Sequence, residues 1–251
     1  MEIEKAFDFS GKNVVITGGT KGIGRSIVRS FVSLNANVFT TYRQEDKSVK
    51  TIKNECDNNL ELKRLDATTS DAAIDLFNWL NSRVNKIDVL INNVGDALKR
   101  SSFKNSNVAL WKSCFAVNFF STVDHCHKLF PLLNSANSSV IINVSSIAGK
   151  TSGAGDSLHY GVSKAALDYF TKGLAKEWGK YNIRVNGVAP SAIDTGFQKR
   201  LSSDKRIKKI IEQTPLGRIG TSGEVASVVV FLSSNLASYI SGETVMITGG
   251  R

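Results

Sequence analysis

A tyrosine and a lysine four residues apart are the residues of this chain best suited to proton transfer. Tyr160 and Lys164 lie in the run Tyr-Gly-Val-Ser-Lys, and apolar residues at helical spacing continue from there to Trp178. Residues four apart share one face of a helix. Because a neighbouring ammonium favours phenolate, it lowers the pKa of a phenol. The spacing predicts an acid/base pair, whereas an isolated pair of this kind on a solvated helix face does no chemistry.

Two further polar residues fall where an acid/base pair needs them. Ser146 follows a run of apolar residues, 140–144, that is typical of a buried strand, and its hydroxyl can hydrogen-bond a substrate oxygen. Asn118 lies in an apolar helical segment, residues 110–120, where a buried amide requires a partner. It can hold an ordered water, although an asparagine inside a helix is more often structural.

A glycine-rich turn predicts a phosphate site. Residues 17–24 read Thr-Gly-Gly-Thr-Lys-Gly-Ile-Gly and stand between a predicted strand and an amphipathic helix. Glycines allow close backbone approach, and a helix N-terminus offers free N–H groups and a partial positive charge to a pyrophosphate. The alternative is a turn that only reverses the chain. The residues expected to contact a cofactor here are Gly18, Thr20, Lys21, Gly22, Ile23 and Gly24.

The elements that must position these residues alternate between strands and helices. Alternation of this kind predicts right-handed crossovers and a doubly wound (Rossmann) α/β fold, with a parallel sheet covered by helices on both faces. In such sheets, ligands bind beyond the carboxyl ends of the strands. The seven predicted strands are Asn13–Thr17, Asn37–Thr41, Leu60–Leu65, Asp88–Asn92, Ser139–Val144, Ile183–Val188 and Glu243–Ile247.

Three local features refine the predicted domain organisation. The run Thr-Thr-Ser-Asp at 68–71 fits a capping box before the next helix. Residues 190–242 carry two helical patterns, and the part around 191–213 is expected to form a flap over the site. No linker, repeat or low-complexity tract is found, so residues 1–251 are expected to form one domain.

Composition narrows the function classes. The chain has 251 residues, 41% of them hydrophobic, and its apolar runs are too short to span a bilayer. Its first residues do not resemble a secretory signal. Three widely spaced cysteines argue against a disulfide framework. The sequence therefore predicts a soluble, cytoplasmic protein with no membrane partner. The run His125-Cys126-His127 predicts no metal site, because consecutive helical residues point in different directions.

The formal net charge of +10 bears on partners and not on fold. The main concentration of basic residues lies at 199–209, within the expected flap. No aromatic-interleaved module accompanies it, so binding of nucleic acid is not expected. Solvated helix faces are the simpler interpretation. The flap can otherwise attract a phosphorylated, carboxylated or thioester-linked acidic substrate.

Taken in this order, the motifs resemble those of the short-chain dehydrogenase/reductase superfamily, in the branch whose members have roughly 250 residues. The turn at 17–24 resembles the family's T-G-x-x-x-G-x-G motif, and Asn-Asn-Val-Gly at 92–95 follows the fourth predicted strand. The resemblance covers nearly the whole chain. It implies an NADP(H)-dependent oxidoreductase that moves hydride between nicotinamide and a carbonyl or an alcohol.

The resemblance also implies roles for individual residues. Tyr160 would be the general acid/base, Ser146 would orient the carbonyl, and Asn118 would anchor the water of a proton relay. Lys164 would lower the tyrosine pKa and bind the nicotinamide ribose. Asp66 would contact adenine, Asn92 the adenosine side and Thr195 the carboxamide of the cofactor. The further cofactor contacts implied are Gly95, Pro190 and Ile193, besides Tyr160 and Lys164 themselves.

Cofactor choice is predicted to be NADP(H). Selection of NAD needs a carboxylate near the end of the second strand, whereas NADP needs cations there. Tyr42 stands at that position, Arg43 follows it, and Lys21 supplies a second cation. Glu45 and Asp46 lie slightly further along the chain and would matter if the strand ended later.

The substrate is less defined than the cofactor. The tail from 214 to 250 most resembles 3-oxoacyl-carrier-protein reductases and related ketone reductases, which favours carbonyl reduction. Residues 133–138 lack the basic side chains that those enzymes present to a carrier protein. An alcohol or sugar dehydrogenase and a non-catalytic cofactor-binding regulator are the alternatives. The family resemblance further implies a homotetramer, and Phe115, Phe119 and Phe120 fit a helix pairing between subunits.

Three residues depart from the family pattern. Val94 stands where alanine is frequent, and Ser191 follows Pro190 where glycine is usual. Thr248 occupies a position near the C-terminus that often holds aspartate. The first two lie close to the expected cofactor site, and the third concerns the expected subunit contact. None of them touches the expected acid/base pair.

Overall fold

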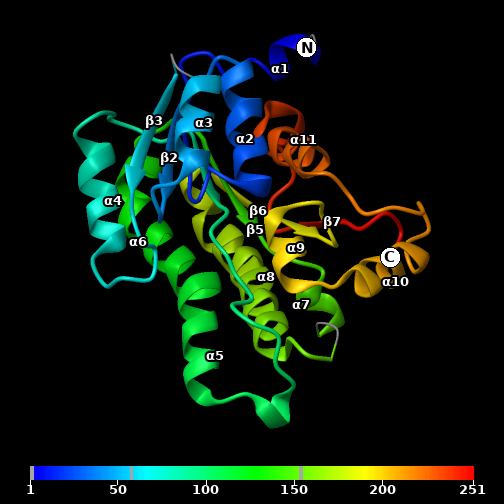
Figure 1. The fold of residues 1–251 in the computed structure, drawn as a ribbon. Helices are drawn as coiled ribbons and strands as arrows, with labels where there is room; N and C mark the ends of the chain where they lie inside the picture. The colour runs from blue at the N-terminus through cyan, green and yellow to red at the C-terminus, as the bar shows by residue number, and fades with distance from the viewer. Residues whose placement is uncertain (1–2, 57–58, 153–154) are drawn as a thin grey trace.

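A computed structural model describes residues 3–56, 59–152 and 155–251. It confirms the predicted doubly wound architecture: seven strands pair in the order β3-β2-β1-β4-β5-β6-β7, and every pairing is parallel (Figure 1). Each predicted strand is present, with ends that differ by at most two residues. The observed bounds are β1 Asn13–Ile16, β2 Asn37–Tyr42, β3 Leu60–Arg64, β4 Val89–Asn92, β5 Ser139–Val144, β6 Ile183–Pro190 and β7 Thr244–Ile247.

The central strands are buried on both faces, which explains their continuous apolar sequences. In β1, Val14 and Ile16 pack into one hydrophobic cluster, whereas Val15 packs into a second cluster on the opposite face. Successive side chains of a strand point to opposite faces, so a run of β-branched residues supplies both layers of core at once. The two clusters hold the sheet between two layers of helices.

Helices of both layers present apolar stripes to the sheet. One layer contributes Ile27, Ile52 and Val229 to the first cluster, and the other contributes Leu76, Leu129 and Leu174 to the second. The first layer consists of α2 Gly22–Ser33, α3 Lys47–Glu55 and α11 Ser222–Ser233, and the second of α4 Ala72–Asn81, α6 Ser121–Asn134 and α8 Leu158–Trp178.

The remaining helical elements are short or lie at the edges of the two layers (Figure 1). None of the helices in the described part of the chain is long and apolar enough to cross a membrane. These elements are α1 Ile3–Ala6, η1 Phe103–Asn105, α5 Val108–Phe115, the π-helix η2 Ala116–Phe120, α7 Ala148–Thr151, η3 Gly179–Tyr181, α9 Gly196–Leu201, α10 Asp204–Glu212 and η4 Asn235–Ala237.

Two local predictions were wrong. Residues 190–242 contain three α-helices, α9, α10 and α11, and not two. Residues 68–71 form no capping box: Thr68 donates both its N–H and its hydroxyl to Asp66, and Asp71 caps α4 without a side-chain bond. Because the Thr68 side chain is hydrogen-bonded to the Asp66 carboxylate, it does not cap the helix that follows. A capping box does form at Thr221 and Glu224, at the start of α11.

The fold creates its binding edge between β1 and β4. The chain winds from β1 outward to β3 on one side, then crosses back to β4 and winds outward to β7 on the other. Loops leaving the carboxyl ends of these two neighbouring strands therefore diverge and leave a crevice, the place where doubly wound sheets bind ligands.

Candidate active site

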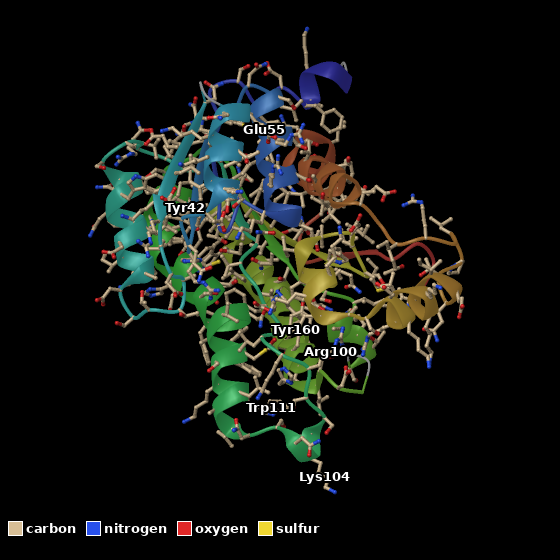
Figure 2. All side chains as sticks on the ribbon, viewed as in Figure 1. Tyr42, Glu55, Arg100, Lys104, Trp111 and Tyr160 are labelled. Carbon is tan, nitrogen blue, oxygen red and sulfur yellow. The ribbon has the colours of Figure 1, made fainter. Side chains whose placement is uncertain are left out.

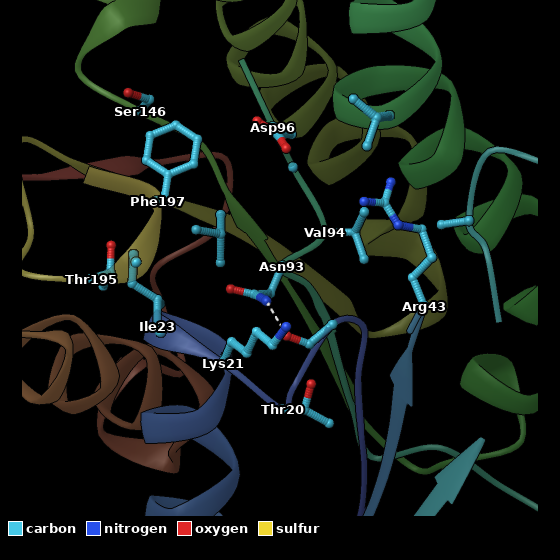
Figure 3. A pocket seen from close by; sticks show the side chains of 18 of the residues that line it. Thr20, Lys21, Ile23, Arg43, Asn93, Val94, Asp96, Ser146, Thr195 and Phe197 are labelled. Atoms are coloured by element: carbon cyan, nitrogen blue, oxygen red, sulfur yellow. Dashed lines mark hydrogen bonds between the residues drawn. The ribbon is translucent and has the colours of Figure 1, made fainter. Parts of the chain in front are cut away.

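A cleft of about 730 Å³ opens at this crevice (Figure 3). Its walls come from the segments that follow β1, β2, β3, β4, β5 and β6, together with the first turns of α8 and with α9. Segments that are far apart in sequence meet there because every parallel strand ends at the same edge of the sheet. Three of the four catalytic candidates, Ser146, Tyr160 and Lys164, line the cleft, whereas Asn118 does not. Every cofactor candidate lines the cleft except Asn92.

The glycine turn approaches the cleft as closely as a phosphate site requires. α2 begins at Gly22, so its first free N–H groups belong to the turn. A Cβ added at Gly24 would lie 2.4 Å from the carbonyl oxygen of Gly18 and 2.5 Å from Nδ2 of Asn93. Only glycine fits at this crossing. The predicted turn residues Gly18, Thr20, Lys21, Gly22, Ile23 and Gly24 all line the cleft.

Arg43 and Lys21, the two cations expected to bind a 2′-phosphate, differ in their surroundings: Lys21 forms an ion pair with a carboxylate, whereas Arg43 lines the cleft. Strand β2 ends at Tyr42, so Arg43 directly follows it, and Figure 3 shows the Arg43 side chain at the cleft. Lys21 forms an ion pair with Asp46, which caps α3 by accepting a hydrogen bond from the backbone N–H of Ser48. The hydrogen bond from Lys21 lowers the pKa of Asp46 to about 2. Lys21 is thus already neutralised before any cofactor binds.

Tyr160 and Ser146 meet at the other end of the cleft. Tyr160 lies in the first turn of α8 (Figure 2), and Ser146 follows β5 (Figure 3). Burial raises the pKa of Tyr160 to about 12, against a lowering contribution from the Ser146 hydroxyl. Without cofactor, Tyr160 is therefore a protonated phenol, and the lowering of its pKa expected from Lys164 is not seen.

Lys164 is buried one helical turn beyond Tyr160. Its Nζ donates to the carbonyl oxygen of Val144 at 2.8 Å and lies 5.9 Å from the centroid of the Tyr160 ring. Burial lowers the pKa of Lys164 to about 8. A Cβ at Gly95 would lie 2.9 Å from this Nζ, so the glycine after β4 leaves the room that the ammonium occupies.

Asn118 lies in the π-helix between α5 and α6, a local irregularity that is frequent at functional sites. Its side chain does not line the cleft. The amide oxygen accepts from the backbone N–H of Asp96 at 3.0 Å, and Nδ2 donates to the carbonyl oxygens of Asp96 at 2.7 Å and Cys114 at 2.8 Å. Through these contacts Asn118 helps to hold the loop after β4 in place.

Asn92 points into the core and not into the cleft. It is 2% exposed, and its Nδ2 donates to Oδ1 of Asn143 at 3.0 Å. The next residue, Asn93, lines the cleft and donates from Nδ2 to the carbonyl oxygens of Thr17 at 2.9 Å and Gly18 at 3.0 Å. The alternation of side chains along the strand explains the difference of one position.

The other cofactor candidates reach the cleft from three segments of the chain, which follow β3, follow β4, and include the end of β6 with the loop after it. Asp66 carries a carboxylate that already accepts two hydrogen bonds from Thr68. Thr195 precedes α9, and its hydroxyl donates to the carbonyl oxygen of Ile193 at 3.3 Å. The members of this set that line the cleft are Asp66, Gly95, Pro190, Ile193 and Thr195.

Sequence reasoning missed three residues that line the reacting end. Phe197 comes from α9, and its ring centroid lies 6.2 Å from that of Tyr160. Asp96 and Arg200 form an ion pair across the cleft, with Nη2 and Oδ1 2.6 Å apart. Arg200 stood within the basic run at 199–209 and Asp96 directly after Gly95. Nothing in the sequence indicated that these two residues form an ion pair, because 104 residues separate them.

The residues present fit a nicotinamide dinucleotide. The helix N-terminus and the crowded glycine crossing suit a pyrophosphate, and the cleft extends from there to the buried lysine and the protonated tyrosine. An extended ligand with a phosphate-rich middle would contact both groups of residues.

Comparisons with known proteins agree with this geometry. Residues 18–251 match a family described as enoyl-(acyl carrier protein) reductase. The chain is 33% identical to a tropinone reductase homolog of Arabidopsis thaliana, over 100% of this chain and 96% of that protein. It is 34% identical to the 3-oxoacyl-[acyl-carrier-protein] reductase FabG of Chlamydia pneumoniae, over 96% of each chain.

Solved structures show the same similarity in three dimensions. A short-chain dehydrogenase/reductase from Brucella melitensis, described as a glucose/ribitol dehydrogenase, has a TM-score of 0.90 at 30% identity, covering 97% of this chain and 98% of its own. An active-site complex of RhlG with NADP from Pseudomonas aeruginosa has a TM-score of 0.91 at 26% identity, covering 98% of both chains. The chain belongs to the short-chain dehydrogenase/reductase family of nicotinamide-dependent oxidoreductases.

Proposed function

We propose that this protein uses NADP(H) to reduce a ketone or 3-oxoacyl-type carbonyl to an alcohol. One observation carries the proposal: Tyr160, Ser146 and Lys164 gather at one end of a cleft whose other part holds the glycine turn and Arg43. A proton donor and a cofactor-binding surface thus share one cavity. The similarity to tropinone reductase homologs and to FabG supports reduction as the direction.

The chemistry requires one hydride and one proton. A nicotinamide cofactor bound in the cleft would supply the hydride to the carbonyl carbon. The Tyr160 hydroxyl donates its proton to the carbonyl oxygen, which becomes the hydroxyl of the product. Burial raises the pKa of Tyr160 to about 12 in the cofactor-free protein, so the phenol is protonated at neutral pH but is a weak acid, and donation requires stabilisation of the phenolate that remains. Ser146 donates a hydrogen bond to the same oxygen and orients it.

Lys164 and Asn118 support Tyr160 in this proposal. The ammonium of Lys164 binds the ribose of the cofactor and stabilises the phenolate that remains after proton transfer. Asn118 holds the loop of Asp96 through its amide, so its part is that of a positioning residue. The expected contact between Asn118 and a relay water is not needed for this role.

Preference for NADP(H) follows from charge at the end of β2. Arg43 lines the cleft where selection of NAD would need a carboxylate, and its guanidinium can form charge-assisted bonds with a 2′-phosphate. Asp66 and Thr195 would contact the two ends of the cofactor, adenine and carboxamide. Asn93 takes the place that the sequence suggested for Asn92.

There are two alternatives to this proposal, and one of them has specific support. The similarity to a glucose/ribitol dehydrogenase favours oxidation of an alcohol or sugar. A non-catalytic regulator would keep the cleft without turnover, and retention of Tyr160 and Lys164 argues against it. An acidic substrate is less favoured than the sequence suggested, because Arg200 and Arg206 of the flap are paired with Asp96 and Asp156.

Assembly as a homotetramer in the cytoplasm completes the proposal. Exposed apolar side chains lie on α5, on the π-helix and on α8: Val108 is 69%, Phe120 53% and Tyr169 81% exposed. A second apolar set lies near the C-terminus, where Tyr239 is fully exposed and Met246 is half exposed. The three cysteines are free, as a reducing compartment would keep them. Light scattering of the purified protein tests the assembly, and a monomer at micromolar concentration contradicts it.

The experiment that tests the function follows oxidation of NADPH in the presence of a panel of ketones and β-ketothioesters. Turnover of any member, with NADPH preferred over NADH, supports the proposal. The regulator is supported instead if the protein binds NADPH, reduces no member of the panel and oxidises none of the corresponding alcohols with NADP⁺.

A further inference from the structure

The reacting end of the cleft holds an ion pair that the proposed proton transfer does not use. Nη2 of Arg200 lies 2.6 Å from Oδ1 of Asp96, and Nη1 of Arg200 donates to the carbonyl oxygen of Leu98 at 3.2 Å. Within the described ranges, no hydrogen bond to Oδ2 of Asp96 is found, and this side chain is 25% exposed. Oδ2 is therefore available as an acceptor in the cleft that also contains Tyr160.

The carboxylate of Asp96 is fixed by the protein body. Both backbone polar groups of Asp96 are bonded to the amide of Asn118, and Oδ1 accepts from the N–H of Leu98 at 2.9 Å. Leu98 has a φ of 61°, a left-handed conformation that the surroundings must enforce. Nε2 of His159 lies 3.1 Å from two carbonyl oxygens in residues 97–99. Such restraint gives the carboxylate one position.

Arg200 reaches the same place from the opposite wall. It belongs to α9, and its guanidinium lies 5.9 Å from the centroid of the Phe197 ring, which in turn packs beside Tyr160. Figure 3 shows Phe197, Ser146 and Asp96 around one part of the cleft. A carbonyl held by Tyr160 and Ser146 therefore has an aromatic ring and an ion pair as its neighbours.

The pair favours an uncharged ligand with a hydroxyl group. A substrate carboxylate would meet the fixed charge of Asp96, and it would have to displace Asp96 from Arg200. A purely apolar substituent would leave Oδ2 without water or a partner, which costs free energy. A hydroxyl satisfies both members, because it donates to Oδ2 and accepts from the guanidinium without separating the pair.

We propose that Asp96 and Arg200 determine substrate specificity by binding a hydroxyl group on the carbon next to the reacting carbonyl. Small uncharged hydroxyketones are accordingly the substrate class. This inference rests on the proposed carbonyl reduction by the same site. It narrows that proposal away from substrates with an acid group beside the carbonyl.

Three small probes differ only at that carbon. Hydroxyacetone carries the hydroxyl, acetone lacks it and pyruvate replaces it with a carboxylate. A hydrogen bond to a charged group corresponds to roughly a tenfold effect or more. Wild-type kcat/KM with NADPH is expected to be at least about tenfold higher for hydroxyacetone than for acetone, and pyruvate is expected to be the poorest of the three.

Asp96→Ala removes the acceptor, and Asp156→Asn is the matched control. Asp156 binds Arg100 at 2.9 Å and Arg206 at 2.8 Å, so it also ties the flap to the body, but it does not line the cleft (Figure 2 shows Arg100). Asp96→Ala is expected to bring the ratio of hydroxyacetone to acetone close to one. Asp156→Asn is expected to change both kcat/KM values together and to keep their ratio.

A binding measurement separates this inference from the proposed function. Saturation-transfer NMR compares propylene glycol with isopropanol on the NADP⁺-loaded protein, which requires no turnover. Stronger binding of propylene glycol by wild type, lost in Asp96→Ala, supports the inference even where no ketone is reduced. Equal binding of the two alcohols, a preference for acetone or pyruvate, or a ratio that survives in Asp96→Ala overturns it.

Discussion

The Nζ of Lys164 is held 2.8 Å from the carbonyl oxygen of Val144, the last residue of β5. This bond fixes a buried ammonium at the strand end from which Ser146 also projects into the cleft. Burial lowers the pKa of Lys164 to about 8. The ammonium is therefore the charged form at neutral pH and loses its proton as the pH rises through that value in the cofactor-free protein.

Lys164→Met is expected to reduce both turnover and NADPH affinity, because one ammonium is assigned to the ribose and to the phenolate of Tyr160. The drop in kcat should reach roughly a hundredfold. Steady-state kinetics and fluorescence titration of NADPH measure the two effects. Circular dichroism checks that the variant folds. Unchanged NADPH affinity would show that Lys164 does not bind the ribose of the cofactor.

Tyr160→Phe keeps the ring against Phe197 but removes the proton donor, so kcat is expected to fall by roughly a hundredfold or more while NADPH binding survives. Near-normal turnover would exclude Tyr160 as the acid. The raised pKa gives a second readout, because a buried phenol stays protonated until about pH 12. Ultraviolet titration of the cofactor-free wild type and the variant should therefore coincide through the range near pH 10, where ordinary tyrosines ionise.

Arg43→Leu is expected to lower kcat/KM for NADPH by roughly tenfold to a hundredfold, since charge-assisted bonds to a 2′-phosphate would be lost. The value for NADH should change little and serves as the internal control. Both cofactors are compared in wild type and variant. A wild type that prefers NADH, or a variant with unchanged preference, would show that Arg43 does not read the phosphate.

Asp46→Asn tests whether the ion pair with Lys21 competes with the cofactor. The amide retains an oxygen that can cap α3, but it releases the charge of Lys21 for a phosphate. NADPH affinity is expected to rise severalfold, with little change for NADH. Glu45→Gln is the matched control, because the Glu45 carboxylate accepts its hydrogen bond from the Tyr42 hydroxyl, which raises the pKa of that phenol. Equal effects of the two substitutions would contradict a specific role for Asp46.

Gly24→Ala tests the close crossing in the glycine turn. The added Cβ would lie 2.4 Å from the backbone oxygen of Gly18, which cannot move without shifting the turn. Overpacking of this kind costs about 1–3 kcal/mol of stability. Thermal unfolding and NADPH titration should both show the loss. Gly173→Ala, on the side of α8 where a Cβ meets nothing within 4 Å, is the control and should leave both values near wild type.

The sequence by itself determined the features that depend on local pattern. Alternating strand and helix periodicity predicted the parallel sheet, the glycine spacing at 17–24 predicted the phosphate turn, and the four-residue interval predicted that Tyr160 and Lys164 share a helix face. Each of these follows from the geometry of one strand, one turn or one helix, so no distant residue is needed to infer it.

Only the tertiary structure decided which side chains face the cleft and which ions pair across it. Asn92 and Asn93 exchange roles because β4 is buried on both faces, so an apolar sequence does not reveal which face each residue takes. The side-chain amide of Asn118 is hydrogen-bonded to the backbone of Asp96 in the loop after β4 and does not face the cleft. The pairs Lys21–Asp46 and Asp96–Arg200 join residues from separate elements, and a sequence pattern carries no information about contacts that the folding of the sheet alone creates.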